Sequence, residues 1–498
     1  MVKRARGALL EAISIDRTGG RKLGVQLYEA LRDLILAGDL APEARLPSSR
    51  MLAQELNLSR TTVVGAYERL EAEGLVEARI GAGSRVARVL QTEGPGPAPA
   101  PGAAVAQTQP PRLSRAVTAA LSLSESRDRL PRAPGAFVTG LPDIDSFPMA
   151  QWARLSARHW RQSRARAMGY GRAGGDPALR EAIAAHLRLN RGIACDPEQV
   201  FVTAGAQQAF QLIGSALLDP GDPVWFENPG AIGARNALIA AGATLVPVPV
   251  DAEGLVVSAG LERAPGFRLA FVTPSHQQPL GSVMSLQRRL QLLSAAQTAG
   301  AWIIEDDYDG EFFFGPRPLP TLAGIDRTGR VIYVGTFSKS IFPALRLGFM
   351  LVPEALAGVF RAVFETSAPG VPAMTEAIVT DFIAEGHFSA HIRRMRRLYR
   401  ERHEALCTAA DAVLGDRLGL VRAESGLHTV GLLGDGLDEA AVAAAAAARG
   451  LQLSPLARYA IAPVGRQGLV IGFGSIRTAE IRRGIDRLAA ALDASRAA

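Results

Sequence analysis

The sequence predicts a multidomain protein, in which a linker joins a small helical domain to a large α/β domain with a mainly parallel sheet. Three observations predict this fold class. At 498 residues the chain is too long for one ordinary domain. Residues 89–134 include the run TEGPGPAPAPGAAVAQTQPP, whose Pro, Ala and Gly content is typical of a flexible linker. From Phe137 onward, apolar runs alternate with amphipathic helical stretches, as in a parallel sheet covered by helices.

Composition narrows the class of protein. Hydrophobic residues make up 48% of the chain, and the net charge of +7, densest in residues 1–88, permits an acidic partner such as DNA. Two cysteines, Cys195 and Cys407, do not make a disulfide framework and indicate a reducing compartment. The Ala-rich run 440–448 is too short to span a bilayer, and the first residues lack a secretory pattern. We therefore expect a soluble, cytoplasmic protein with no membrane partner.

Residues 1–88 are expected to form three helices and a β-hairpin. The first helical pattern, VQLYEALRDLILAG, stops at Gly38. The second begins in LPSSRMLAQEL, where Ser48 or Ser49 can cap the helix. The turn NLS leads into RTTVVGAYERLEAEG, and the glycines of VEARIGAGSRVARV then predict two short strands. This order is typical of a winged helix-turn-helix, whose third helix contacts DNA. A small helical domain with a solvated basic face is the alternative.

The segment GDLAPEARLPSSRMLAQELNLSRTTVVGAYERLEAEGLV resembles the winged helix-turn-helix domain of GntR-type transcription regulators. The resemblance implies a double-stranded DNA operator as partner. It implies a minor-groove contact from the hairpin at Gly81. The contacts that it implies on the helices are those of Arg50, Ser59, Arg60, Thr61 and Thr62.

In the large domain, six apolar runs are expected to be strands: QVFVTAG, PVWFENP, TLVPVPV, RLAFVTP, AWIIEDD and VIYVGTF. Several end in Gly, Pro or Asp, and ligands gather at the carboxyl ends of such strands. The loop GTFSKSIFPALRLGF places Lys339 directly after the last of them. A neutral lysine amine can form a Schiff base with an aldehyde, and pyridoxal 5'-phosphate (PLP) is the aldehyde cofactor held in this way.

PLP also needs a carboxylate at its ring nitrogen, a donor to its ring hydroxyl and a phosphate site. The run IIEDDYDGEF offers Asp306 and Tyr308 for the first two roles. Thr336, Ser338 and Arg346 surround Lys339, and the helix start in TAGAQQAF can hold a phosphate with its backbone amides. Taken singly, each motif has a structural alternative: a surface loop, a solvated or metal-like acidic turn, or an ordinary helix start. No metal is expected.

From Phe137 to about Ile485 the chain resembles fold-type I PLP-dependent aminotransferases. The motifs FVTGLPDIDSFP, YGRAGGDPALREAIAAHLRLNRGI, VFVTAGAQQA, FENPG and TPSHQQPLG follow that family's order. A GntR-like domain fused to this fold is typical of the MocR/GabR subfamily, which implies a PLP-binding homodimer with Lys339 as the Schiff-base lysine. The implied cofactor contacts are Asp306 at the ring nitrogen, Tyr308 at the ring hydroxyl, Thr336, Ser338, Arg346, Ala206 and Gln207 at the phosphate, and Tyr170 at the neighbouring subunit's phosphate.

Several positions depart from the family pattern. Ala231 follows ENPG where an aromatic residue often stacks on the ring, and Gln278 or His276 would replace the family's asparagine. Val470 of GLVIGFG stands where aminotransferases commonly carry an arginine for the substrate carboxylate. For an effector carboxylate, the best remaining binder is expected to be Arg235, with Arg458 behind it; the alternative for Arg235 is a surface helix arginine.

The leading interpretation is a PLP-dependent, DNA-binding transcription regulator, whose aminotransferase-like domain senses a small amino-compound effector or PLP itself. The alternative is an active aminotransferase that also binds DNA, which steady turnover of an amino donor and a keto acid would reveal. A third interpretation is a DNA-binding protein whose large domain has lost the cofactor, and this protein would be colourless.

Overall fold

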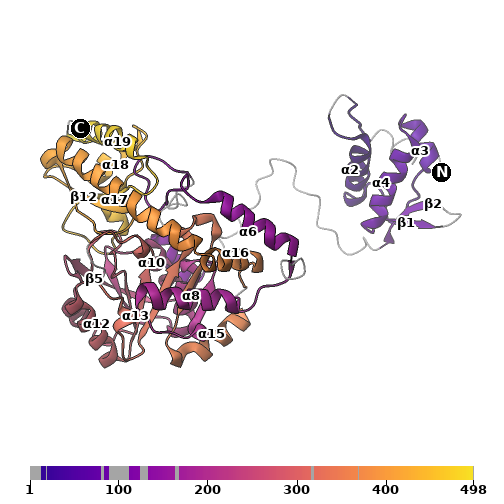
Figure 1. Cartoon of the computed structure of the whole chain (residues 1–498). Coiled ribbons are helices and arrows are strands. Elements are labelled where there is room, and N and C mark those ends of the chain that lie inside the picture. The colour runs from indigo at the N-terminus through magenta and orange to yellow at the C-terminus, as the bar shows by residue number, and fades with distance from the viewer. Residues whose placement is uncertain are drawn as a thin grey trace. The chain divides into compact units, whose positions relative to one another are not determined.

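A computed structural model of the chain describes residues 13–17, 20–79, 83–88, 112–123, 133–162, 168–315, 319–367 and 370–496. The chain divides into two compact units, Met1–Arg112 and Leu113–Ala498 (Figure 1). Each unit has its own hydrophobic core. No helix in the described ranges is long and apolar enough to cross a membrane.

The small unit contains three helices and a two-stranded antiparallel sheet, as predicted. Its elements are α2 (Leu23–Leu36), α3 (Ser49–Glu55), α4 (Arg60–Ala72), β1 (Val76–Arg79) and β2 (Gly83–Val86). One face of each helix supplies the core, including Leu31 of α2, Leu52 of α3 and Leu70 of α4. Ser48 caps α3 by accepting a hydrogen bond from the backbone N–H of Met51. The predicted helical domain with a terminal hairpin is therefore confirmed in the described residues.

The predicted linker, residues 89–134, is only partly described. Helix α5 (Arg115–Leu123) lies within it and contacts α10 (Ile232–Ala240) of the large unit. The prediction of an unstructured linker is wrong for α5. The run RAVTAALSL is rich in good helix formers, and the Ser114 hydroxyl accepts from the backbone N–H of Val117 at 3.2 Å. The Pro-rich residues 89–111 lie outside the described ranges.

The large unit is built on an eight-stranded sheet of order β3-β10-β9-β8-β7-β4-β5-β6. Its strands are β3 (Val200–Thr203), β4 (Pro223–Asn228), β5 (Thr244–Asp251), β6 (Gly254–Leu255), β7 (Leu269–Val272), β8 (Trp302–Asp307), β9 (Val331–Thr336) and β10 (Gly348–Leu351). Strands β5, β4, β7, β8 and β9 pair in parallel, whereas β10 is antiparallel to both β3 and β9. The predicted mainly parallel sheet is confirmed, with all six predicted strands in place.

Helices cover both faces of this sheet. Ile304 of β8 packs with side chains of α9 (Ala206–Leu217), α10 and α15 (Glu354–Ser367), while its neighbour Ile303 packs with α11 (Val257–Arg263), α12 (Leu286–Ala299) and α13 (Leu322–Ile325). Successive side chains of a strand alternate between its two faces. Asp306 therefore shares a face with Ile304, and Asp307 shares the opposite face with Ile303.

The C-terminal part of the chain forms a smaller layer. Its antiparallel sheet has the order β11-β12-β14-β13, and its strands are β11 (Leu418–Leu420), β12 (His428–Leu433), β13 (Ser454–Pro455) and β14 (Gly468–Gly472). Figure 1 shows α17 (His387–Val413), α18 (Glu439–Ala447) and α19 (Thr478–Arg496) gathered beside β12 at one end of the large unit. The remaining described α-helices are α6 (Met149–Gln162), α8 (Pro177–Arg191), α14 (Phe337–Ser340) and α16 (Ala373–Ala384).

Candidate functional site

A cavity of about 250 Å³ opens where the carboxyl ends of β8 and β9 meet the start of α9 and the edge of the C-terminal sheet. Its wall brings together residues that lie far apart in the sequence. Of those predicted as cofactor contacts, it contains Ala206, Gln207, Gln278, Tyr308, Thr336, Ser338, Lys339 and Arg346. The carboxyl edge of the sheet is therefore where the predicted side chains converge.

Lys339 lies in α14, the single helical turn that follows β9. The Thr336 hydroxyl fixes the start of this turn by accepting from the backbone N–H of Ser338 at 3.2 Å. The Lys339 amine donates to the carbonyl oxygen of Gly140, and a Cβ atom at position 140 would lie 3.3 Å from that amine. Burial lowers the pKa of Lys339 to about 8, although the carboxylates of Asp309 and Asp306 act in the opposite direction. A larger neutral fraction makes the amine a better nucleophile.

Asp306 is the last residue but one of β8 and is 5% exposed, and it is not among the side chains that line the cavity. Its Oδ1 atom is buried and has no hydrogen-bond partner among the described residues. Burial, together with the nearby carboxylates of Asp309 and Glu227, raises the pKa of Asp306 well above its ordinary value. Burying a carboxylate oxygen without a donor is unfavourable. The protonated ring nitrogen of PLP is a donor that fits this position, so the residues present suit the cofactor.

Tyr308 and Asp309 line the cavity, and polar contacts join both of them to the buried His276. The Tyr308 hydroxyl lies 3.0 Å from Nδ1 of His276, and the same nitrogen lies 2.9 Å from Oδ2 of Asp309. A proton on Nδ1 satisfies Asp309 and leaves the hydroxyl proton of Tyr308 free for a ligand. The sequence interpretation considered His276 as a direct contact, whereas the structure places it behind Tyr308. It also missed Asp309, whose only signal was the acidic run EDDYD.

One end of the cavity has the features of a phosphate site. Helix α9 begins at Ala206, so the helix offers no partner to the backbone N–H groups of Ala206 and Gln207, whereas those of the next two residues donate to the Gly205 carbonyl. Gly205 precedes it with φ of 92°, and a Cβ at this position would lie 3.9 Å from the Arg346 guanidinium. The side chain of Gln207 donates to the Gly233 carbonyl at 2.9 Å and is therefore held by the chain itself. Ser338 and Thr336 line the same cavity.

Arg235 does not lie in the cavity wall, where the sequence interpretation expected it to bind an effector carboxylate. Its side chain is buried, at 3% exposure, and does not line the cavity. Its Nη1 atom donates to the carbonyl oxygens of Arg458 and Ala460, at 3.2 Å each. The guanidinium thus ties α10 to the 3₁₀ turn η7 (Leu456–Tyr459), so Arg235 is neither presented to an effector nor a surface arginine. Both interpretations of this residue are corrected by its contacts.

Arg458 and Tyr170 also lie outside the cavity wall, as Asp306 and His276 do. Arg458 lies in η7, and its Nη1 atom is 3.3 Å from the Ser454 hydroxyl. Tyr170 is fully exposed, at 106% of its reference area, and borders a separate surface hollow with Arg172. Ala231 caps α10 and is buried, while the next residue, Ile232, lines the cavity. The wall at this point is therefore aliphatic rather than aromatic.

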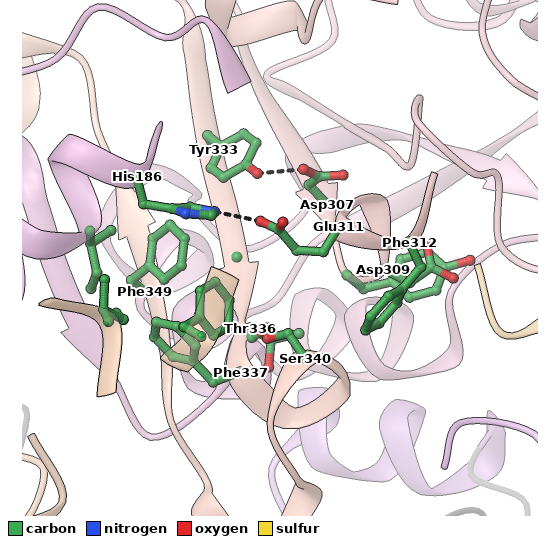
Figure 2. A pocket seen from close by; sticks show the side chains of 15 residues that line it. His186, Asp307, Asp309, Glu311, Phe312, Tyr333, Thr336, Phe337, Ser340 and Phe349 are labelled. Carbon is green, nitrogen blue, oxygen red and sulfur yellow. Dashed lines mark hydrogen bonds and ion pairs between the residues drawn. The ribbon is translucent and has the colours of Figure 1, made fainter. Parts of the chain in front are cut away.

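A second, much smaller cavity of about 20 Å³ lies on the other face of β8 and β9. Figure 2 shows His186 pointing to Glu311 and Tyr333 pointing to Asp307 across it. Although burial acts in the opposite direction, the His186 hydrogen bond and nearby positive charges lower the pKa of Glu311 to about 2. Asp307 also pairs with Arg191 of α8. This network fixes the strand ends beneath the larger cavity.

The predicted DNA contacts lie at the start of α4 and on α3. Arg50, Arg60 and Thr61 are exposed, and Thr62 is partly buried. The Ser59 hydroxyl accepts from the backbone N–H of Thr62 at 3.0 Å and lies 2.7 Å from the Thr61 hydroxyl. Ser59 is therefore the helix cap, in addition to any contact that it makes with DNA. Gly81 lies outside the described residues.

Two family profiles match this chain. Residues 23–86 match "Bacterial regulatory proteins, gntR family", and residues 139–488 match "Aminotransferase class I and II". The chain is also similar to the solved structure of LysN, an alpha-aminoadipate aminotransferase from Thermus thermophilus. The TM-score is 0.67 and the identity 29%, over 77% of this chain and 96% of that one.

Regulators are similar over nearly the whole chain. The probable rhizopine catabolism regulatory protein MocR of Rhizobium meliloti is 41% identical, over 96% of this chain and 95% of that protein. The pyridoxine biosynthesis transcriptional regulator PdxR of Corynebacterium glutamicum is 32% identical, over 90% and 91%. Since both domains match and the likeness runs through both, the chain belongs to the MocR/GabR-type transcription regulators, in which a GntR-type winged helix-turn-helix is fused to an aminotransferase-like domain.

Proposed function

We propose that this regulator holds PLP on Lys339 and uses it to sense an amino compound or PLP itself. The observation that carries the proposal is the use of lysine. Lysine and arginine together number 55, but only Lys3, Lys22 and Lys339 are lysines. Arginine stays protonated and cannot supply a neutral amine, whereas lysine can. A chain that otherwise relies on arginine has its one lysine after position 22 in the wall of the cavity.

Residues in and next to the wall support this assignment. Asp306 would accept from the protonated ring nitrogen, and the Tyr308 hydroxyl would donate to the ring oxygen. The first amides of α9 and the Arg346 guanidinium would hold the phosphate. When bound, PLP supplies an electrophilic aldehyde to which an amino compound can add.

The contact between Lys339 and Gly140 suggests how ligand binding in the cavity affects other parts of the chain. Gly140 lies in the segment between α5 and α6, on the path of the chain from the small unit into the large one. Lys339 can donate to the Gly140 carbonyl while its amine is free. It loses N–H donors when the amine is linked to the cofactor and regains them when an amino compound takes its place. The two states would hold the segment differently, and sensing needs only such a differential interaction.

We also infer a homodimer that binds an operator in the cytoplasm. Tyr170 is fully exposed and serves no contact in the cavity of its own chain, which fits a role in a neighbouring subunit. Met168, at 75%, and Leu113, at 50%, are exposed apolar side chains that a second copy would cover. Two winged helix-turn-helix units would then contact two half-sites on the operator.

Borohydride trapping tests the proposal directly. The full-length protein is loaded with PLP, reduced with borohydride and digested, and the modified peptide is located by mass spectrometry. We expect the adduct on Lys339 alone, and its loss in Lys339→Ala. Lys22→Arg is the matched control and should leave the adduct unchanged. An adduct confined to Lys3 or Lys22, or none at all, contradicts the proposal. Steady transamination by the loaded protein would instead favour an active aminotransferase that also binds DNA.

A further inference from the structure

We infer that the sensed amino compound carries no carboxylate or other anionic group, and that it belongs to the amino alcohols and amino polyols. This inference rests on the proposed function and concerns the part of the cavity next to the cofactor.

Among the described residues of the wall, no cationic side chain remains available to bind an anionic ligand. Among the described residues that line the cavity, only Lys339 and Arg346 are lysines or arginines. Lys339 would be linked to the cofactor, and Arg346 sits beside Gly205 at the phosphate end. His428 also lines the cavity, but burial and the neighbouring His276 lower the pKa of His428 to about 3, so its imidazole is neutral.

The wall is apolar where a substrate carboxylate would need a partner. Val470 of β14 is 1% exposed and packs against Val430, Leu456 and Tyr459, with Ile232 at the edge of the same cluster. A carboxylate placed against this cluster would lose its water without gaining a donor. The apolar wall therefore selects against amino acids.

The nearest arginines outside the wall do not supply a positive charge to the cavity. Arg235 donates to the backbone carbonyls of Arg458 and Ala460 and does not line the cavity. Arg458 also stays outside the wall, with Nη1 at 3.3 Å from the Ser454 hydroxyl. To bind a ligand carboxylate, Arg235 would have to leave two carbonyl oxygens without a donor.

Neutral hydrogen-bonding groups remain on the wall. Thr139, Gln278, His428 and Tyr459 all line the cavity. The Tyr459 hydroxyl interacts with the hydroxyls of Ser454 and Thr139, and Nε2 of His428 lies 3.2 Å from the Pro279 carbonyl. Hydroxyl and amide groups of this kind match the hydroxyls of a ligand rather than its charge. An amine with hydroxyl groups on its carbon skeleton can form hydrogen bonds with the neutral polar groups, while its carbon atoms pack against the apolar wall.

Matched ligand pairs test the inference on the PLP-loaded, full-length protein. Serinol is compared with serine, and alaninol with alanine, since each pair exchanges a hydroxymethyl group for a carboxylate. An aminocyclitol is added as the polyol probe. The readouts are the visible absorbance change of the cofactor and the change in operator affinity. We expect the amino alcohols to bind at least about tenfold more tightly than their amino acids, because a site without a partner for a charged group rejects it.

Equal binding within the pairs, a preference for the amino acids, or no binding by any amino alcohol or polyol would overturn the inference. An arginine supplied by a second copy of the chain would appear as an amino-acid preference. These outcomes are distinct from failure of the proposed function, in which the protein would bind no cofactor and show no visible absorbance.

Substitution at Val470 gives an independent test. Val470→Arg should raise the affinity for serine and alanine by about tenfold or more, because it places a bidentate donor in the apolar wall. Val470→Met is the matched control, since it adds bulk without charge and should not improve amino-acid binding. Arg458→Gln should leave the wild-type preference unchanged. If Val470→Arg folds and gains no amino-acid affinity, the role assigned to this wall is wrong. If it does not fold, the ligand pairs decide.

Discussion

Two neighbouring carboxylates in β8 have opposite roles because a strand alternates its side chains between faces. Asp307 contacts Arg191 and Tyr333 through its Oδ2 atom, which matches its charge, although its Oδ1 atom has no hydrogen-bond partner among the described residues. Asp306 lies on the opposite face of the strand, where no arginine or lysine forms an ion pair with it and one buried oxygen is unpaired among the described residues. A site that binds a cationic ring nitrogen must present such an oxygen, although the cofactor-free protein is less stable for it.

The substitution Asp306→Asn should separate these two effects. It should weaken PLP binding by about 1–3 kcal/mol, because a hydrogen bond to a charged group is lost. It should also stabilise the cofactor-free protein at neutral pH. The raised pKa of Asp306 means that the unfolded chain loses its proton first, so stability falls as the pH rises above the ordinary aspartate range. Cofactor titration and thermal unfolding at several pH values measure both effects.

Asp307→Asn is the control for this pair. It removes the partner of a buried arginine and should destabilise the protein with or without PLP, by about 3–5 kcal/mol. If Asp306→Asn also destabilises the cofactor-free protein, the unpaired oxygen of Asp306 does not lower the stability of the folded state.

A pH dependence follows from the lowered pKa of Lys339. Only the neutral amine attacks an aldehyde, and in the cofactor-free protein that form becomes dominant above about pH 8 instead of above 10.5. The rate of PLP addition should therefore rise with pH and level off above about 8. Stopped-flow absorbance between pH 7 and 10 measures this rate. A rate that keeps rising through pH 10 would show that the cavity does not perturb the lysine.

At the scale of elements, the start of α4 combines a structural cap with exposed groups. Ser59 is used by the helix itself, because its hydroxyl accepts from the backbone N–H of Thr62. Arg60 is the first residue of the helix and is exposed. Replacing Ser59 should therefore affect stability, and replacing Arg60 should affect DNA binding, although the two residues are adjacent in the sequence.

We predict that Arg60→Ala weakens operator binding by about 1–3 kcal/mol without changing thermal stability, because it removes a DNA contact only. Ser59→Ala should lower the stability of the small unit by about 1 kcal/mol, because it removes a cap. Fluorescence anisotropy at several salt concentrations and thermal unfolding of both variants separate the effects. An unchanged affinity and salt slope for Arg60→Ala would exclude α4 as the reading helix.

Elements and motifs with a local signal could be predicted from the sequence, and contacts between distant segments could not. The six strands have apolar runs of their own, and Lys339 follows one of them directly. The role of Arg235 depends on the backbone of η7, more than 200 positions away, which no local pattern reveals. Strand β10 begins in the apolar end of the loop that carries Lys339 and was not predicted. Its pairing with β3 and β9 depends on the topology of the sheet, which no local pattern reveals.

At the scale of the whole molecule, two folded units share one chain, and regulation requires that a change in one reach the other. The Pro-, Ala- and Gly-rich run 89–111 connects them, and α5 follows it as part of the large unit. The small unit depends on this connection for its high local concentration near the large one. Cutting the chain there should therefore separate DNA binding from sensing without unfolding either unit.

Limited digestion with elastase, which cuts after small residues, tests this separation. Residues 89–111 hold many alanines and no lysine or arginine, so elastase suits them better than trypsin. We expect first cleavage in this run, because α5 packs on α10 and should be protected. The large fragment should keep the cofactor absorbance. The small fragment should keep operator affinity but lose its response to the amino compound, since no covalent path remains. Intact mass and anisotropy on the purified fragments measure each point. First cleavage within α5 would contradict its protection by α10, and loss of cofactor on cutting would mean that the large unit does not keep its fold alone.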